Sequence, residues 1–283
     1  MVARFATLQK VMFSMSADPD AWTVLLLGGV EGLTEFLPVS STGHLILAGE
    51  LLGHVGEESK SFRIAVQLGA ILAVLVAYRE RFLSAGQGVV RREEEALRFA
   101  RNILIGFLPA ILVGVVAYDA VRTMLGSAEV VATALVAGGA AMLWLDRRME
   151  PGRFEKVEAI PPRRAVTVGV LQCLAMVPGV SRSGASILGA LAVGVERRAA
   201  AEFSFFLAVP TMIAATTYDL YRNRRLLGLD QLGDILLGGA AAFVTALLVV
   251  KAFVALVSRH GFAPFAWYRI AAGSVALVWL ALR

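Results

Sequence analysis

Six long apolar stretches limit what this chain can fold into. Each is close to the roughly 17–25 residues that an α-helix needs to cross the hydrocarbon core of a bilayer. None shows the alternation of apolar and polar residues that is typical of a membrane β-barrel, so all six predict helices. The expected spans are about 62–78, 102–120, 128–145, 199–219, 232–257 and 262–282.

The composition agrees with a membrane protein. The chain of 283 residues is 58% hydrophobic and 17% charged, whereas soluble domains usually have about 45–50% apolar and about 25% charged residues. The net charge of +5 raises the question of nucleic-acid binding. However, no basic stretch is interleaved with aromatic residues, and the arginines adjoin apolar runs. We therefore attribute the basic charge to membrane orientation and to an anionic substrate, and we expect no nucleic-acid partner.

Two further apolar regions, 21–53 and 165–195, are interrupted midway. The interruptions, "PVSSTGH" at 38–44 and "PGVSRSGA" at 178–185, resemble each other, and their glycines Gly43 and Gly184 lie 141 residues apart. Each is followed by an apolar half-helix and then by three spans. This pattern is typical of two repeats that each begin with a re-entrant helical hairpin. Irregular backbone at membrane depth must be covered by protein or water, so we expect the interruptions to face each other.

The predicted fold is an all-α polytopic membrane protein with two inverted-topology repeats, each a re-entrant hairpin followed by three transmembrane helices. Lysine and arginine are more numerous on the side of the long loops 79–101 and 146–164, which places that side in the cytoplasm. The first hairpin would then enter the membrane from outside and the second from inside. The predicted divisions are a surface tail at 1–20, repeat 1 at 21–145, a cytoplasmic loop at 146–164 and repeat 2 at 165–283.

The first interruption places ionisable side chains at membrane depth, where such groups are costly and usually functional. Glu31 and Glu35 are four residues apart and share a helix face. Pro38 ends that half-helix, and Ser41 and His44 share a face at the start of the next one. A hydroxyl, an imidazole and two carboxylates are therefore expected to line one pocket. The candidates to cap the second half-helix are Ser40, Ser41 and Thr42.

The second interruption repeats this design with an arginine added. Pro178 and Gly179 end one half-helix, and Ser181 and Ser183 are candidates to cap the next. Arg182 lies between these serines, and arginine is well suited to bidentate binding of phosphate. Free backbone N–H groups at two helix starts also favour an anion. The sequence thus predicts an anion site at mid-membrane, with phosphate as the favoured ligand.

These motifs resemble those of a known family. "EGLTEFLPVSSTGH" (31–44) and "PGVSRSGA" (178–185) are similar to the two signature motifs of the bacitracin-resistance undecaprenyl pyrophosphate phosphatases, BacA or UppP, and the similarity extends over about 21–283. The resemblance implies hydrolysis of undecaprenyl diphosphate to undecaprenyl phosphate and inorganic phosphate in the bacterial inner membrane, which recycles a lipid carrier of cell-wall synthesis. It also implies an active site toward the periplasm and dependence on a divalent cation.

The resemblance also implies the residues of the site. The catalytic residues would be Glu31, Glu35, Ser41, His44 and Arg182, and the substrate-binding residues Ser40, Thr42, Ser181, Ser183 and Gly184. We expect Glu31 and Glu35 to hold Mg²⁺ or Ca²⁺, because hard cations prefer carboxylate oxygens. Attack on phosphorus by Ser41 with His44 as its base is the preferred route. Attack by His44 itself and attack by water activated by a glutamate stay open, because spacing alone does not separate them.

The alternative function is a transporter or flippase of a lipid phosphate or another anion, since secondary carriers also use inverted repeats with broken helices. The Ser41–His44 pair beside two glutamates favours the enzyme, because a carrier needs charge balance but no nucleophile. The expected partners are a polyprenyl diphosphate and the bilayer. Glycine- and alanine-rich stretches such as "LLGGAAAF" at 236–243 would also allow close helix packing, including that of a homodimer.

Overall fold

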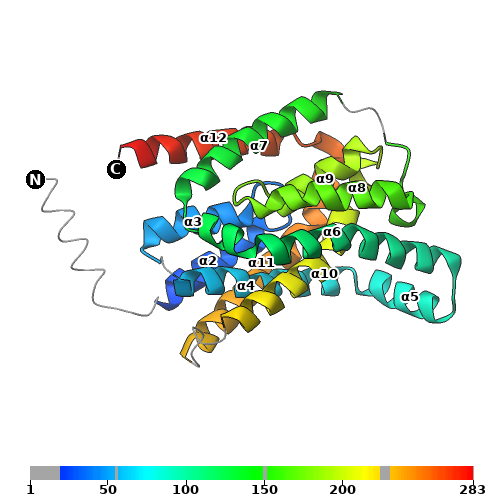
Figure 1. Cartoon of the computed structure of the whole chain (residues 1–283), viewed down its shortest axis with the longest axis horizontal. Coiled ribbons are helices and arrows are strands. Elements are labelled where there is room, and N and C mark those ends of the chain that lie inside the picture. The colour runs from blue at the N-terminus through cyan, green and yellow to red at the C-terminus, as the bar shows by residue number, and fades with distance from the viewer. Residues whose placement is uncertain (1–19, 55–56, 149–151, 224–229, 283) are drawn as a thin grey trace, which may run out of the picture.

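The computed structural model describes residues 20–54, 57–148, 152–223 and 230–282, which form helices joined by short loops (Figure 1). Six of the described helices are long and apolar enough to cross a membrane. Each predicted span coincides with one of them, which confirms an all-helical, multi-pass membrane protein. These helices are α4 Glu57–Ala77, α6 Glu94–Met124, α7 Ala128–Arg148, α10 Arg197–Arg222, α11 Asp230–His260 and α12 Ala263–Ala281.

The two interrupted regions form helical hairpins. The first consists of α2 (Ala21–Thr34) and α3 (Ser41–Leu52). The second consists of α8 (Pro162–Gln172), a short 3₁₀ turn η2 (Cys173–Met176) and α9 (Arg182–Ala192). In Figure 1, α2 and α3 lie toward the left end of the molecule, and α8 and α9 toward the right. The relation of the complete halves as inverted repeats stays a prediction.

Both hairpins begin their second helix in the same way. Ser40 and Ser181 are the N-caps of α3 and α9. Each side-chain oxygen accepts a hydrogen bond from the backbone N–H three residues later, that of Gly43 or Gly184. Both serines have a positive φ, 72° and 78°, which is uncommon for a residue with a side chain and concentrates at functional sites. Of the cap candidates named from the sequence, Ser40 is therefore the N-cap in the first hairpin and Ser181 in the second.

Glycines bring the hairpin helices close to the spans behind them. A Cβ atom at Gly28 of α2 would lie 2.2 Å from the Gly238 carbonyl oxygen of α11. A Cβ atom at Gly169 of α8 would lie 2.3 Å from the Gly106 carbonyl oxygen of α6. Only glycine allows backbones to approach this closely. Within the glycine- and alanine-rich stretch at 236–243, Gly238 and Ala242 are therefore buried against neighbouring helices, whereas Leu236 and Leu237 are exposed.

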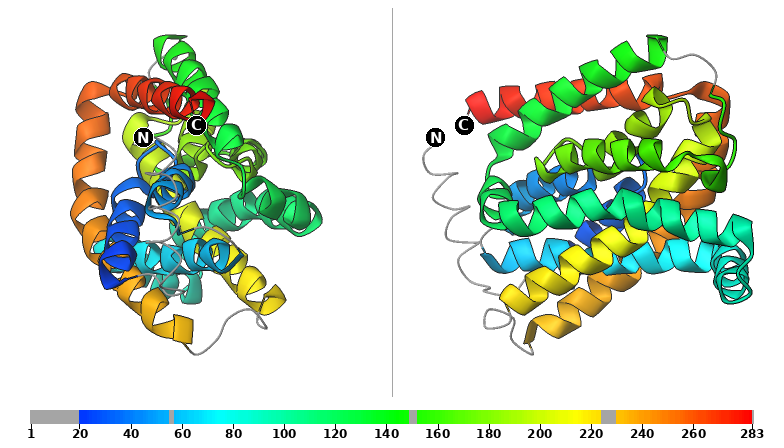
Figure 2. Two further views of the ribbon diagram at one scale, coloured as in Figure 1. Left: turned by 90° about the vertical axis from the view of Figure 1, so that its left-hand side faces the viewer. Right: turned by 45° about the vertical axis from the view of Figure 1, so that its right-hand side comes forward.

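The region predicted as a loop at 79–101 is mostly helical. α5 (Arg79–Val90) follows α4 after Tyr78 and packs against α6, which begins at Glu94. Figure 2 shows α5 at one end of the bundle, and it also shows α7 and α12 side by side. The arginine-rich composition of 79–101 gives no hydropathy signal, although arginine is a good helix former. A search for apolar stretches therefore does not predict α5.

The predicted tail at 1–20 lies outside the described residues except for Asp20. Asp20 is the N-cap of α2, and its carboxylate oxygen Oδ1 accepts a hydrogen bond from the Thr23 backbone N–H at 2.7 Å. Aspartate is among the preferred N-cap residues, because it satisfies a backbone N–H that the helix leaves unpaired. The start of the first hairpin is thus fixed by a local capping interaction.

Candidate active site

The two hairpins meet at their tips, residues 35–40 and 177–181, in the middle of the bundle. Arg182 Nη2 donates a hydrogen bond to Glu35 Oε1 at 2.8 Å, and both side chains are largely buried. Ser183 Oγ donates to the Leu37 carbonyl oxygen at 2.8 Å. The two interruptions therefore face each other, and a buried ion pair joins them.

Glu35 connects a hydroxyl group to a guanidinium group. Ser41 Oγ donates a hydrogen bond to Glu35 Oε2, while Arg182 occupies Oε1 of the same carboxylate. A carboxylate bound to a serine hydroxyl can take its proton and so activate it as a nucleophile. Arg182 orients that carboxylate and places a positive charge beside the hydroxyl. We call these three residues the Ser–Glu–Arg triad.

Arg182 has a donor left for a ligand. Its Nη1 donates to the backbone oxygen and to the hydroxyl oxygen of Ser204, at 3.0 and 3.2 Å, and Nη2 also lies 3.6 Å from Met212 Sδ. Its Nε is buried and has no hydrogen-bond partner. Buried donors are rarely unpaired, and arginine pairs well with phosphate oxygens. The free Nε therefore favours an anionic ligand at this position.

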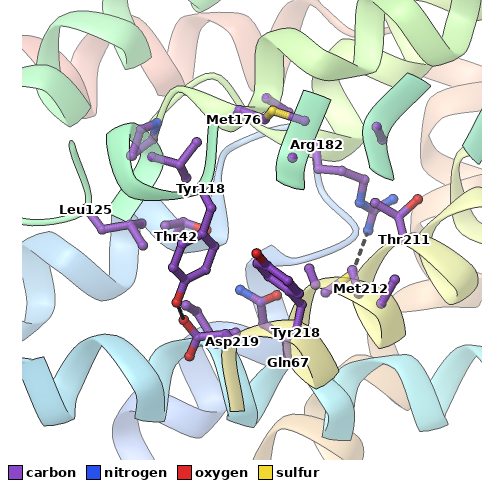
Figure 3. A pocket seen from close by; sticks show the side chains of 18 of the residues that line it. Thr42, Gln67, Tyr118, Leu125, Met176, Arg182, Thr211, Met212, Tyr218 and Asp219 are labelled. Carbon is purple, nitrogen blue, oxygen red and sulfur yellow. Dashed lines mark hydrogen bonds between the residues drawn. The ribbon is translucent and has the colours of Figure 1, made fainter. Parts of the chain in front are cut away.

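All three residues of the triad line a cavity of about 700 Å³. Figure 3 shows Arg182 on one side of this cavity, across from Asp219. Faces of α4, α6 and α10 form most of its wall, and apolar side chains predominate there. A cavity of this size and lining suits a small polar head group together with part of an apolar chain. The hairpin residues that carry polar groups into it are Glu35, Ser40, Ser41, Thr42, Ser181 and Arg182.

His44 contacts groups other than Ser41, whose hydroxyl donates to Glu35 instead, and the role of His44 as the base of Ser41 stays a prediction. Its Nδ1 lies 2.7 Å from the Ser40 carbonyl oxygen, and its Nε2 lies 2.7 Å from the Tyr268 hydroxyl of α12. A carbonyl oxygen can only accept, so Nδ1 carries a proton and donates to Ser40, while Nε2 is engaged by the Tyr268 hydroxyl. No lone pair is left for Ser41. Spacing correctly put both residues at the start of α3 but did not show that Glu35 turns back toward the serine.

Glu31 is a buried carboxylate without a hydrogen-bond partner. Its side chain is 0% exposed, and both oxygens are unpaired. Its charged neighbours are Glu35 and Arg182. An unpaired carboxylate at this depth is costly unless a cation or a proton neutralises it. The oxygens of two neighbouring carboxylates suit Mg²⁺ or Ca²⁺, so the residues present fit a divalent cation.

The donor set for such a cation is incomplete within the protein. The described part of the chain has no group of three or more histidine, cysteine, aspartate or glutamate side chains that could hold a metal ion. Magnesium is commonly bound through one or two carboxylates together with water and the phosphates of a substrate. Two glutamates beside a phosphate-binding arginine match that pattern. A bound phosphate would therefore complete the site.

The other predicted substrate-binding residues divide into two groups. Ser40, Thr42 and Ser181 line the cavity. Ser183 and Gly184 lie behind it, where Ser183 Oγ contacts Leu37 and Ser181, and the Gly184 N–H donates to the Ser181 hydroxyl oxygen at 3.0 Å. The second group therefore holds the hairpin tips in place, whereas the first can contact a ligand.

The sequence analysis missed Arg269 of α12, which is 1% exposed. Its Nη1 donates to the carbonyl oxygens of Pro38 and Val180, at 3.1 and 2.9 Å. Its Nη2 donates to the Gly179 carbonyl oxygen at 2.9 Å. Arg269 thus joins the tips of both hairpins. An arginine inside the predicted span 262–282 was the available signal, because charges at membrane depth usually have a function.

Fold and site together define a class of polytopic membrane protein. In this class, two helical hairpins meet inside the bundle and bring together a buried serine, glutamate and arginine that can bind a phosphate group. The family model described as "Bacitracin resistance protein BacA" matches residues 24–275. The chain therefore belongs to the BacA family, which confirms the resemblance carried by its two motifs.

Curated relatives align over nearly the whole chain. An undecaprenyl-diphosphatase from Sphingopyxis alaskensis is 62% identical over 264 residues, which cover 93% of this chain and 99% of the relative. Proteins of the same name from Rhizorhabdus wittichii and Novosphingobium aromaticivorans are 54% and 55% identical, and each alignment covers 92% of this chain and 98% of the relative. Each of these alignments thus covers more than nine-tenths of this chain.

Proposed function

We propose that this chain hydrolyses undecaprenyl diphosphate to undecaprenyl phosphate and inorganic phosphate. The observation that carries the proposal is the carboxylate of Glu35, which is bound at once to Ser41 and to Arg182. The names of the relatives support a polyprenyl diphosphate as substrate. The reaction would take place in the bacterial inner membrane, toward the periplasm, and would return the carrier lipid to cell-wall synthesis and confer bacitracin resistance.

Ser41 is the nucleophile of the proposed reaction. Its Oγ bonds to the terminal phosphorus as Glu35 takes the hydroxyl proton, and the bond from that phosphorus to the bridging oxygen breaks. Glu35 passes the proton to the leaving phosphate of the lipid. Arg182 neutralises the charge on the transferred phosphoryl group. Water then attacks the phosphoserine, its proton returns through Glu35 to Ser41, and inorganic phosphate leaves. One chain contains the whole triad, so no second copy is required.

Glu31 and Glu35 hold a divalent cation, Mg²⁺ or Ca²⁺, in this proposal. The two unpartnered oxygens of Glu31 support that assignment. When bound, the cation supplies positive charge to the diphosphate. In Glu31→Gln, a neutral amide oxygen replaces the carboxylate oxygen that would bind the cation. We therefore expect this variant to bind Mg²⁺ or Ca²⁺ more weakly. Direct titration of the protein with either metal ion measures the difference.

Detergent-solubilised protein is expected to release phosphate from a polyprenyl diphosphate, and to lose most of that activity in a chelator. We expect a decrease of about tenfold or more, because charge neutralisation dominates phosphoryl transfer. Added Mg²⁺ or Ca²⁺ should restore the rate. A colorimetric phosphate assay measures both effects. Intact substrate after prolonged incubation would instead favour the transporter, since a detergent micelle has no second compartment.

His44→Gln is expected to lower the rate less than removal of the Ser41 hydroxyl, by about tenfold at most. His44 braces the start of α3 through Ser40 and Tyr268 but has no free lone pair for catalysis. Initial rates of phosphate release measure the loss of activity, and acid-quenched protein is tested for a phosphorylated residue. A phosphorylated histidine at position 44, or a loss as large as that of Ser41→Ala, would contradict this assignment.

A further inference from the structure

The guanidinium group of Arg182 is held by α10 as well as by Glu35. Ser204 of α10, which is 0% exposed, accepts hydrogen bonds from Arg182 Nη1 through its backbone oxygen at 3.0 Å and its Oγ at 3.2 Å. Arg182 Nη2 donates to Glu35 Oε1 at 2.8 Å. Arg182 Cζ lies 5.7 Å from the centre of the Phe36 phenyl group. The guanidinium group therefore contacts α10 and the tip of the first hairpin at once.

Ser186 of α9 connects Ser204 back to Arg182. The hydroxyl oxygens of Ser186 and Ser204 lie 2.7 Å apart, and Ser186 is also 0% exposed. Ser186 Oγ donates a hydrogen bond to the Arg182 backbone oxygen at 2.8 Å. The contacts thus run from the Arg182 side chain through two serine hydroxyls to the Arg182 backbone. We call this closed set of contacts among Arg182, Ser204 and Ser186 the hydrogen-bond ring.

The direction of each contact in the hydrogen-bond ring follows from its two end groups. A guanidinium group only donates, and a backbone carbonyl oxygen only accepts. Ser204 Oγ therefore accepts from Arg182 Nη1 and donates its own proton to Ser186 Oγ. The Ser186 proton goes to the Arg182 carbonyl oxygen. Each hydroxyl accepts once and donates, and hydrogen bonds that are aligned in this way polarise and strengthen one another.

The ring and Glu35 together engage both terminal nitrogens of Arg182. Nη1 donates to Ser204, whereas Nη2 donates to Glu35 and lies 3.6 Å from Met212 Sδ (Figure 3). Nε is left without a hydrogen-bond partner within the described part of the chain. The plane and direction of the guanidinium group are therefore fixed before a ligand binds. A donor that is already oriented needs little reorganisation during the reaction.

We propose that Ser204 and Ser186 are positioning residues for phosphoryl transfer. Through the hydrogen-bond ring they set the place of the Arg182 guanidinium group relative to Glu35 and the attacking hydroxyl. This role rests on the proposed function, in which Arg182 neutralises the transferred phosphoryl group. Small displacements of a catalytic group cost large factors in rate. Neither serine is among the described residues that line the cavity, so both act through Arg182 and not by touching substrate.

Ser204→Ala is expected to lower kcat for a polyprenyl diphosphate about tenfold and to change KM less than about twofold. Arg182 keeps its contacts with Glu35 and with the backbone oxygen at position 204, so the variant should fold. The matched control is Ser84→Ala, which removes an exposed hydroxyl that donates to the Arg81 carbonyl oxygen and should keep both constants. Both constants are measured on folded protein isolated by size-exclusion chromatography. A lower yield with an unchanged kcat would show a merely structural role and would overturn the proposal.

Ser186→Ala opens the hydrogen-bond ring without removing a contact of the guanidinium group. We expect it to lower kcat in the same direction as Ser204→Ala, by about threefold. The double variant should be no slower than Ser204→Ala alone, because the ring is already open in the single variant. Losses in kcat that multiply in the double variant would mean that the two serines act separately, and would overturn the ring.

Binding of inorganic phosphate distinguishes failure of this proposal from failure of the proposed function. Equilibrium dialysis of the detergent-solubilised full chain against radiolabelled inorganic phosphate requires no turnover. Ser204→Ala should weaken binding about threefold in the wild-type background and not at all in Arg182→Lys, because lysine has no planar fork to orient. Unchanged binding in Ser204→Ala, or equal weakening in both backgrounds, would overturn action through Arg182. Absence of hydrolysis by the wild-type protein would overturn the proposed function instead, and the dialysis comparison would still decide on the ring.

Discussion

Ser41→Ala is expected to lower phosphate release from a polyprenyl diphosphate on the order of 10³-fold or more. The substitution removes the attacking oxygen, whereas the buried ion pair of Glu35 with Arg182 remains and keeps the hairpin tips together. The variant should therefore fold and bind substrate. Initial rates of phosphate release measure the loss. Rapid acid quenching of the wild-type protein, followed by mass spectrometry, should locate a phosphoryl group on Ser41.

Two further variants make this result specific. Ser258→Ala removes an exposed hydroxyl that contacts only the Val254 carbonyl oxygen among the hydrogen bonds described, and it should keep the wild-type rate. Glu35→Gln should be nearly as inactive as Ser41→Ala, because an amide cannot take the proton of the serine. Substantial activity in Ser41→Ala, together with no phosphoenzyme in the wild-type protein, would contradict serine attack and favour direct attack by water.

Much of the fold could be predicted because membrane depth leaves few structural choices. Apolar stretches of spanning length form helices, since no water is present to satisfy backbone groups. Proline, glycine and serine within such a stretch stop one helix and start another, and Ser40 and Ser181 do begin the second helices of the hairpins. α5 could not be found in this way, because a short helix rich in arginine resembles a polar loop in hydropathy.

The members of the site could be grouped from the sequence, but their pairing could not. Charged and hydroxyl side chains are rare at membrane depth, so Glu35, Ser41 and Arg182 were recognisable before their contacts were known. Their pairing depends on the path of the chain between α2 and α3. That path turns Glu35 toward Ser41, while His44 meets Tyr268, 224 residues further along the chain. Local spacing contains no information on such a distant partner.

Arg269→Gln is expected to lower both stability and activity, because it separates the hairpin tips from each other. The guanidinium donates to the carbonyl oxygens of Pro38, Gly179 and Val180. Each buried carbonyl that loses its donor costs about 1–3 kcal/mol. Arg269 is not among the described residues that line the cavity, so it acts as a positioning residue through the loops that carry the triad.

The expected result is a lower thermal midpoint in detergent, by several degrees, and phosphate release reduced about tenfold or more per folded molecule. The folded fraction is isolated by size-exclusion chromatography before kcat and KM are measured. Arg259→Gln, at an exposed position near the end of α11, is the matched control and should change neither quantity. A purely structural role would lower the yield but leave the kcat and KM of the folded fraction unchanged, which would contradict positioning of the triad.

Gly138→Ala in α7 also tests the contact between the Arg269 guanidinium and the hairpin tips, and it does so without changing any charge. A Cβ atom at Gly138 would lie 2.0 Å from Arg269 Nη2, so the guanidinium must move away from the hairpin tips. The variant should therefore lower kcat in the same direction as Arg269→Gln. Because both changes act on one contact, their effects on the free energy of activation should be less than additive in the double variant. Gly86→Ala, where an added Cβ meets no atom within 4 Å, is the control. Full additivity would mean that Gly138 and Arg269 act independently. The contact of Arg269 with the hairpin tips would then not be what positions the triad.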